Sequence, residues 1–198
     1  MKQLKMYWKA EPSTYPENTP EWHYRTYDGS QRDRDAWVEI CTHGLLGPGA
    51  EQPFEKYMSS MEIFDENSLF FVEHDGEIVA TIAALTDQNK VGLFHMVGAA
   101  RECRGHGVGN LLAKIAKARL WECGATHAYL TTDEFRVPAV KSYLTAGFCP
   151  VNWDTDMEAR WLGMLYFLEV TDVPFVEEDG TFIKLLNPSA PQPEAAAE

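Results

Sequence analysis

The chain has 198 residues, of which 45% are hydrophobic and 24% are charged, the composition of a soluble globular protein with a domain of moderate size. No apolar run approaches the ~20 residues that a membrane-spanning helix needs, so a membrane protein is not expected. The formal net charge of -13 argues against a nucleic-acid partner, because proteins that bind phosphate backbones need a basic face. The same charge favours a cationic ligand.

The start of the chain has no continuous apolar segment of the signal-peptide type, so we expect a cytoplasmic protein. The four cysteines are scattered without a C-x-x-C pair, which predicts reduced thiols rather than disulfides or a zinc site. The six histidines show no paired ligand spacing, so no metal is expected.

The first half of the chain predicts strands and two helices after an N-terminal extension, residues 1–21. Strand-type composition or apolar residues at helical spacing mark each element. The predicted elements are a strand over 22–27, a helix carrying Trp37, Ile40 and Cys41, a short helix over 54–61, and strands over 68–74 and 77–86. Asp75-Gly76 separates the last two strands, and such a pair is the strongest short hairpin signal, so these strands should be antiparallel neighbours.

The second half begins with a strand that leads directly into a glycine-rich stretch. The predicted elements are a strand over 91–100, a helix from Gly109 to a C-cap at Gly124, a strand over 126–132, a helix from Val137 to Gly147, a strand over 148–151, a helix over 157–168, and a hairpin over 175–186 around Asp179-Gly180. We expect one domain over 22–152, with residues 153–186 packed on it and a disordered tail over 187–198.

Residues 101–110, RECRGHGVGN, place three glycines on alternate positions between a predicted strand and a predicted helix. This order gathers free backbone N–H groups and the positive end of a helix dipole at one point, an arrangement that binds phosphate. The stretch lies in a basic island, since residues 101–119 contain five basic side chains and one acidic side chain. A small phosphorylated ligand is therefore expected here.

Two common phosphate loops do not match this stretch. A Walker loop requires G-x-x-x-x-G-K-[ST], but Asn110 and Leu111 follow Gly109. A Rossmann loop requires G-x-G-x-x-G in a doubly wound parallel sheet, and the predicted hairpin before the loop does not suit such a sheet.

Two other motifs resemble those of the GCN5-related N-acetyltransferase (GNAT) superfamily. R-x-x-G-x-G, residues 104–109, resembles its pyrophosphate loop, and A-x-x-x-Y-x-x-x-G-F, residues 139–148, is similar to its second motif. The motifs stand in the right order on matching elements, and the resemblance covers roughly residues 22–152. It implies an α/β fold with a mixed, mainly antiparallel sheet, splayed strands and about four to five flanking helices.

The resemblance implies an acetyl-coenzyme A (acetyl-CoA) site in a V-shaped opening between the splayed strands. The N–H groups of residues 105–110 would bind the pyrophosphate, and residues 97–99 would pair with the pantetheine arm and point an N–H at the thioester oxygen. Gly98 suits a β-bulge, and Arg136 stands where the superfamily often has an asparagine that contacts the pantetheine arm. The predicted cofactor-binding residues are Val97, Gly98, Ala99, Arg104, Gly105, His106, Gly107, Val108, Gly109, Asn110 and Arg136.

Acetyl transfer to an amine needs an unprotonated amine, a donor for the developing oxyanion, and a proton for the leaving thiolate. The resemblance places Tyr143 at the superfamily's general-acid position. The base is open among His95, Asp133, Glu134 and water. His95 lies four residues before Ala99 on the predicted strand, so we expect the two on the same face.

We expect acetyl transfer from acetyl-CoA to a primary amine of a small cationic molecule, by direct attack in a ternary complex. The resemblance implies that residues 43–58 and 153–161, both mixed acidic and aromatic, build the acceptor side. A non-catalytic acyl-CoA-binding sensor or scaffold and a protein lysine or N-terminal acetyltransferase stay open as alternatives. The C-terminal hairpin can cover a sheet edge or pair with a second copy in a homodimer.

Overall fold

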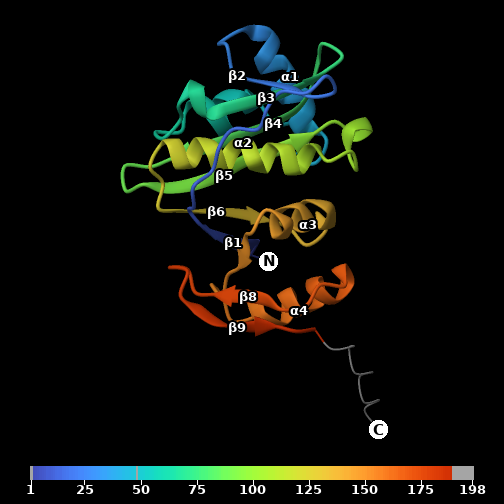
Figure 1. Cartoon of the computed structure of the whole chain (residues 1–198). Helices are drawn as coiled ribbons and strands as arrows, with labels where there is room; N and C mark the ends of the chain where they lie inside the picture. The colour runs from blue at the N-terminus through green and yellow to red at the C-terminus, as the bar shows by residue number, and fades with distance from the viewer. Residues whose placement is uncertain (1, 48, 189–198) are drawn as a thin grey trace. The chain divides into compact units, whose positions relative to one another are not determined.

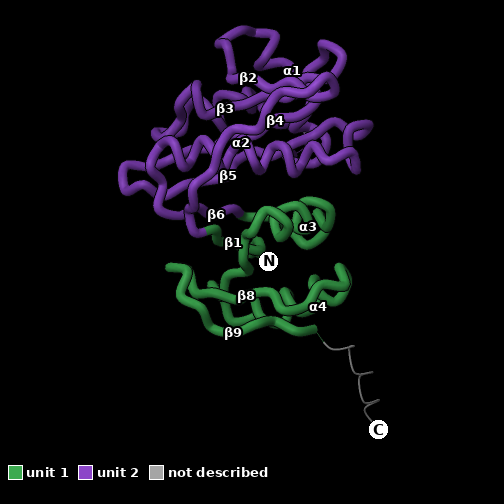
Figure 2. Tube along the Cα trace, viewed as in Figure 1, with its two compact units in different colours: residues 1–8, 131–198 green, residues 9–130 purple. Residues whose placement is uncertain are grey.

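The computed structural model describes residues 2–47 and 49–188, and the chain divides into two compact units (Figures 1 and 2). Unit 2 consists of residues 9–130. Unit 1 combines the N-terminal residues up to Trp8 with the chain from Thr131 onward. Each unit has its own helices and strands, and the unit boundaries, at residues 8–9 and 130–131, fall near the ends of two strands.

Unit 2 contains a mixed sheet with the strand order β2-β3-β4-β5-β6 (Figure 1). Strands β2 to β5 are antiparallel neighbours and β6 is parallel to β5, which confirms the predicted mixed, mainly antiparallel sheet. The strands are β2 (His23–Thr26), β3 (Leu69–His74), β4 (Glu77–Thr86), β5 (Val91–Ala99) and β6 (His127–Thr132). The helices are α1 (Gln31–Thr42), η1 (Glu55–Ser59), η2 (Glu66–Ser68), η3 (Arg101–Cys103) and α2 (Val108–Glu122).

The turn between β3 and β4 has the chemistry that its sequence predicts. Asp75 has a φ of 49° and Gly76 a φ of 82°, and two positive φ angles are the condition for a type I′ hairpin turn. His74 pairs with Glu77 at the base of the turn. The predicted hairpin is therefore confirmed.

Helices cover both faces of the unit 2 sheet. On one face, Ala83 of β4 lies in an apolar cluster with Trp37 of α1 and Met58 of η1. On the other face, a Cβ added at Gly92 of β5 would approach a Leu120 methyl of α2 to 2.9 Å. The residues of β4 are buried from Val79 to Leu85 because alternate side chains pack on opposite faces.

Two irregularities shape the C-terminal part of β5. Met96 has a φ of 48°, and the register with β4 shifts between Thr81 and Ala83, so one residue of β5 bulges from the ladder. β6 pairs with β5 only from Val91 to Leu93. Beyond that point β5 pairs, among the described residues, with β4 alone. The predicted splay therefore begins after the first three residues of β5.

Unit 1 contains two antiparallel strand pairs, β1 with β7 and β8 with β9. A parallel bridge between Val151 and Val176 connects the hairpin to the residue that follows β7. The strands are β1 (Leu4–Lys9), β7 (Cys149–Pro150), β8 (Val173–Val176) and β9 (Phe182–Leu186). The helices are α3 (Val137–Thr145) and α4 (Met157–Leu168).

One prediction for the N-terminus differs from the structure. The sequence predicts an extension over residues 1–21, but Leu4–Lys9 form β1. Its alternate residues Leu4, Met6 and Trp8 are buried, as expected for a strand with one face in the core. The predicted helix over 157–168 and C-terminal hairpin are confirmed. The predicted tail lies outside the described residues from residue 189 onward.

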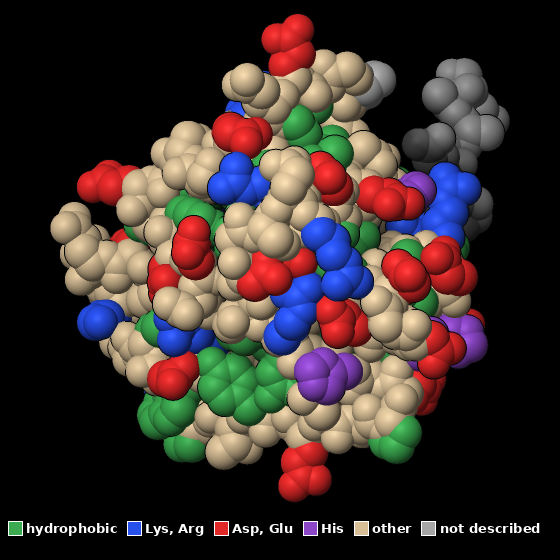
Figure 3. Space-filling model, turned by 90° about the horizontal axis from the view of Figure 1, so that it is seen from above, with side chains coloured by type: hydrophobic (Ala, Val, Ile, Leu, Met, Phe, Trp, Pro, Cys, Tyr) green, Lys and Arg blue, Asp and Glu red, His purple; other side chains and the backbone are tan. Residues whose placement is uncertain are grey.

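Within the part of the chain that the structure describes, no helix has the length and hydropathy to cross a bilayer. The same residues contain no cluster of three or more His, Cys, Asp or Glu side chains that could hold a metal ion. Figure 3 shows acidic and basic side chains interspersed over the face in view. The net charge of -13 is therefore not gathered into one acidic patch on that face.

Candidate active site

The predicted phosphate loop is an exposed turn that leads into α2. Gly105 and Gly107 both have a φ of 85°, a conformation that residues with a Cβ rarely adopt. A Cβ added at either position would meet no atom within 4 Å. Gly107 is the N-cap of α2, a helix of 15 residues. The glycines thus leave open space beside the positive end of a helix dipole.

The loop also presents a row of unpaired donors. The backbone N–H groups from Gly105 to Gly109 donate no hydrogen bond within the described chain. Those of Asn110 and Leu111 donate to the carbonyl oxygen of Gly107, at 3.0 and 3.2 Å. The predicted donor set therefore loses Asn110, whose N–H is used inside the loop. The remaining row fits an anion with several oxygen atoms.

Part of the basic island has a structural role. Arg119 forms ion pairs with Asp65 at 2.6 Å and Glu122 at 3.0 Å. Lys117 forms an ion pair with Glu11 at 3.0 Å. These two cations stabilise unit 2 and add little positive charge at the loop, because nearby carboxylates neutralise them.

Arg104 fastens the start of the loop to neighbouring backbone. Its guanidinium donates to the carbonyl oxygen of Ala99 at 3.2 and 3.3 Å and to that of His43 at 3.2 Å. Ala99 ends β5, and His43 is the C-cap of α1. Arg104 therefore joins the ends of β5 and α1 to the loop. The prediction that Arg104 and His106 bind the cofactor stays a prediction.

The bulge at Met96 decides which face of β5 each predicted residue occupies. His95 pairs with Ala83, and Ala99 pairs with Ala80. Paired residues share a face of the sheet, and residues three apart on a strand point to opposite faces. The prediction that His95 and Ala99 share a face is therefore wrong, because the bulge inserts one residue between them.

Gly98 has a packing role in the structure. The sequence predicts a bulge at Gly98, but Gly98 pairs regularly with Thr81 and the bulge lies at Met96. A Cβ added at Gly98 would lie 2.8 Å from Cγ2 of Ile40 and 3.2 Å from Cδ1 of Leu45. The C-terminal end of α1 and the residues after it thus approach β5 closely because position 98 has no side chain.

We expect Gly98→Ala to lower the free energy of unfolding by about 1 to 2 kcal/mol, because the new methyl group must displace Ile40. Gly163→Ala is the matched control: position 163 lies inside α4, where an added Cβ meets nothing within 4 Å. It should raise the free energy of unfolding by about 0.5 to 1 kcal/mol. Urea unfolding measures both. Equal effects would contradict close packing at Gly98.

His95 is bound to η1 rather than exposed to solvent. Its Nε2 lies 2.8 Å from the carbonyl oxygen of Tyr57. Burial lowers the pKa of His95, and the hydrogen bond to Tyr57 opposes that effect. The imidazole is therefore neutral at pH 7. The assignment of His95 as the base stays a prediction, without support from this geometry.

Tyr143, the predicted acid, lies on α3 and is buried. Its ring packs edge-on against Phe148, with ring centroids 6.2 Å apart. Burial raises the pKa of Tyr143 to about 12, although the nearby charge of Arg136 acts in the opposite direction. The phenol is therefore a protonated donor at neutral pH.

The two carboxylates named as alternative bases hold cations. Asp133 forms an ion pair with Arg136 at 3.1 Å and accepts a hydrogen bond from Gln3 at 3.1 Å. Glu134 forms a close ion pair with Arg160. Both carboxylates are engaged by cationic side chains, and these contacts favour structural roles for both groups.

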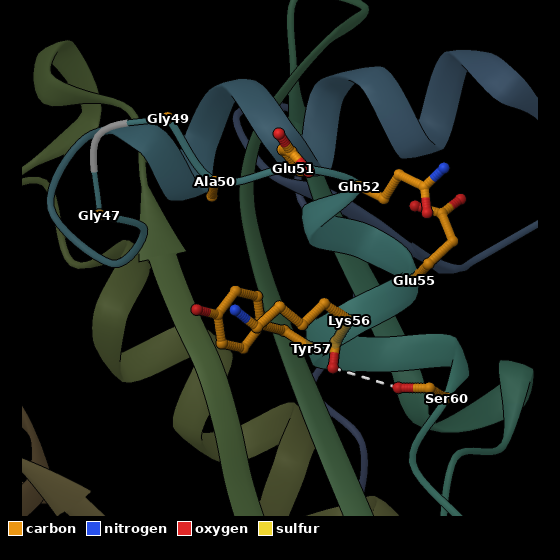
Figure 4. A pocket seen from close by; sticks show the side chains of 9 residues that line it. All are labelled: Gly47, Gly49, Ala50, Glu51, Gln52, Glu55, Lys56, Tyr57 and Ser60. Atoms are coloured by element: carbon orange, nitrogen blue, oxygen red, sulfur yellow. Dashed lines mark hydrogen bonds between the residues drawn. The ribbon is translucent and has the colours of Figure 1, made fainter.

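A hollow of about 710 Å³ lies in the predicted acceptor segment of unit 2 (Figure 4). The loop after α1 forms one part of its wall and η1 another, and two carboxylates stand on it. The lining residues are Gly47, Gly49, Ala50, Glu51, Gln52, Glu55, Lys56, Tyr57 and Ser60. Its volume is within the range of small-molecule sites.

Three contacts connect the segments around the hollow to β5 and to the glycine loop. The carbonyl group of Tyr57 binds His95, and Leu45 lies against Gly98. Arg104 binds the carbonyl group of His43. The wall of the hollow is therefore positioned by the same strand that leads into the glycine loop.

The acetyltransferase (GNAT) family matches residues 8–148, well over half of the chain. The chain therefore belongs to this family, whose members use acetyl-CoA. The confirmed sheet and the open glycine loop at the start of α2 agree with that membership.

Two curated relatives are named mycothiol acetyltransferase. The one from Thermomonospora curvata is 29% identical over 132 residues, 63% of this chain and 43% of the relative. The one from Nocardiopsis dassonvillei is 25% identical over 171 residues, 76% of this chain and 50% of the relative. The chain thus spans about half the length of these relatives.

The structure of a GCN5-related N-acetyltransferase from Sphaerobacter thermophilus is similar, with a TM-score of 0.62 and 20% identity. The match covers 76% of this chain and 49% of that chain. At this identity the similarity supports the fold and not the substrate.

Proposed function

We propose that this chain transfers acetyl from acetyl-CoA to the primary amine of a small cationic molecule, by direct attack in a ternary complex. The observation that most strongly supports acetyl-CoA binding is the row of unpaired N–H groups from Gly105 to Gly109 beside open space. These groups are assigned to the pyrophosphate. Acetyl-CoA supplies the acetyl thioester when bound. Residues 97–99 are assigned to its pantetheine arm, since β5 has no β6 partner there.

The chemistry requires a path for the amine proton. An amine of the lysine type has a pKa near 10.4, so only about one molecule in 2,500 is unprotonated in water at pH 7. Asp133 and Glu134 hold cations, and His95 holds the carbonyl group of Tyr57. These contacts favour water as the first proton acceptor. Tyr143 is assigned to donate to the leaving thiolate.

The hollow supports a cationic acceptor. Glu51 and Glu55 line it, and the protein as a whole carries a net charge of -13, so a positively charged amine is attracted to it. The glutamates are balanced in part by Lys56 and by Arg34, which lies 3.7 Å from Glu55. The name of the curated relatives adds mycothiol-related amines to the candidates.

The test is thiol release from acetyl-CoA with a panel of amines. Polyamines, aminoglycosides, amino acids and mycothiol-related amines are compared with lysine-containing and N-terminal peptides. We expect turnover with small cationic amines and a KM that rises with ionic strength, because salt screens their attraction to the hollow. Turnover with peptides alone would identify a protein acetyltransferase. Saturable acetyl-CoA binding without turnover would identify a sensor or scaffold.

A further inference from the structure

We infer that His95 is a positioning residue for the acceptor: its imidazole fixes η1, and with it one wall of the hollow, to β5 immediately before the bulge. This inference rests on the proposed function, because it takes the hollow as the acceptor site. In this inference His95 positions the wall of the hollow and does not accept the proton of the amine.

The direction of the hydrogen bond follows from its partner. The carbonyl oxygen of Tyr57 can only accept, so Nε2 of His95 carries the hydrogen and Nδ1 does not. Burial lowers the pKa of His95 and so disfavours a second proton on the ring. Protonation is therefore not needed for the contact, and the neutral ring is sufficient.

The carbonyl group of Tyr57 needs a donor from outside its helix. η1 is a π-helix of 5 residues, and the last carbonyl groups of any helix lack intrahelical partners. After η1, the N–H of Ser60 binds the oxygen of Glu55, and the N–H of Met61 binds that of Met58. His95 completes this set by binding Tyr57, so it caps the C-terminal end of η1 from β5.

The consequence for the hollow follows from where η1 lies. Glu55, Lys56 and Tyr57 of η1, and Ser60 just after it, all line the hollow (Figure 4). The residue after His95 is Met96, where β5 bulges. One hydrogen bond therefore links the wall that would hold the amine to the start of the β5 segment assigned to the acyl donor.

The test uses two substitutions at His95 and one matched control. His95→Gln keeps a side-chain N–H near the position of Nε2 but cannot titrate, and His95→Leu removes the donor. His74→Leu is the control, since Nδ1 of His74 also lies 2.8 Å from a backbone carbonyl oxygen, that of Glu21, which does not line the hollow. Steady-state kinetics with the best amine give KM and kcat, and titration gives the Kd of acetyl-CoA.

We expect His95→Leu to raise the acceptor KM about tenfold, the effect of one lost hydrogen bond, while kcat and the Kd of acetyl-CoA change much less. His95→Gln should recover most of the loss, and His74→Leu should leave the acceptor KM unchanged. The pH profile of kcat/KM should keep the same limbs in both His95 variants. Equal losses of kcat in Gln and Leu, with loss of the acidic limb, would identify His95 as the base and overturn the inference.

A second measurement needs no turnover. Hydrogen exchange at the amide of Ser60, which is bonded to Glu55, should be faster in His95→Leu than in wild type and near wild type in His95→Gln. Unchanged exchange in His95→Leu would overturn the inference even if the enzyme is active. Absence of turnover with every amine, together with the expected exchange, would instead count against the proposed function and leave the cap on η1 standing.

Discussion

Replacing Tyr143 with Phe should lower kcat about 100-fold, within the range typical for loss of a general acid. The pKa of Tyr143, about 12, lies well above the ~8.5 of an ordinary thiol, so full proton transfer to the thiolate is uphill in the free protein. In the role proposed for it, the protonated phenol stabilises the developing charge by donating a hydrogen bond. Phe removes this donor and keeps the ring that packs against Phe148.

The sign of the pH dependence follows from the raised pKa. A phenol with a pKa of about 12 stays protonated between pH 6 and pH 10, so wild-type kcat should show no falling limb from Tyr143 in that range. Tyr166→Phe, a half-exposed tyrosine on α4, is the control and should leave kcat unchanged. Wild-type turnover in Tyr143→Phe, with unchanged stability, would assign the proton to another donor.

Replacing Gly107 with Ala should raise the Kd of acetyl-CoA about 100-fold. The new Cβ enters the open space beside the unpaired N–H groups, where it blocks close approach of a phosphate. The residue must also keep a φ of 85°, which costs about 1 kcal/mol in a residue with a side chain. Isothermal titration with acetyl-CoA measures the Kd, and thermal unfolding shows that the protein remains folded.

The control for Gly107 is Gly124→Ala, at the other end of α2. Gly124 has a φ of 75° and also has no atom within 4 Å of an added Cβ, so backbone strain is matched. It should lose similar stability and bind acetyl-CoA normally. If both variants bound equally well, or lost binding equally, the glycine loop would not be the pyrophosphate site.

Local sequence signals predicted the parts of the fold that depend on adjacent residues. Asp75-Gly76 predicted the hairpin, and Gly124 predicted the end of α2, because each conformation is set by the residues themselves. β1 was not predicted, although LKMYWK alternates between buried and more exposed residues. Its partner β7, Cys149–Pro150, lies within the strand predicted over 148–151, but no local signal indicates that strands so far apart in the chain pair with each other.

The glycine loop was also predictable, because its conformation is set by its own residues. The irregular pairing and the contacts of β5 were not predictable in this way. The bulge at Met96 arises from the register of two strands, and methionine at a positive φ has no sequence signature. That single inserted residue moves His95 to the face opposite Ala99. The expectation that residues four apart on β5 share a face, which holds for a regular strand, therefore fails here. The bond from His95 to Tyr57 likewise depends on where η1 ends, which helical periodicity does not define to the residue.

The composition of unit 1 from both ends of the chain has a consequence for biosynthesis. Met6 pairs with Pro150, so β1 leaves the ribosome well before its partner β7 is synthesised. During that interval three large apolar side chains, Leu4, Met6 and Trp8, lack their final neighbours. Deletion of residues 1–9 would therefore destabilise the C-terminal third of the chain, because it removes β1, the strand that pairs with β7.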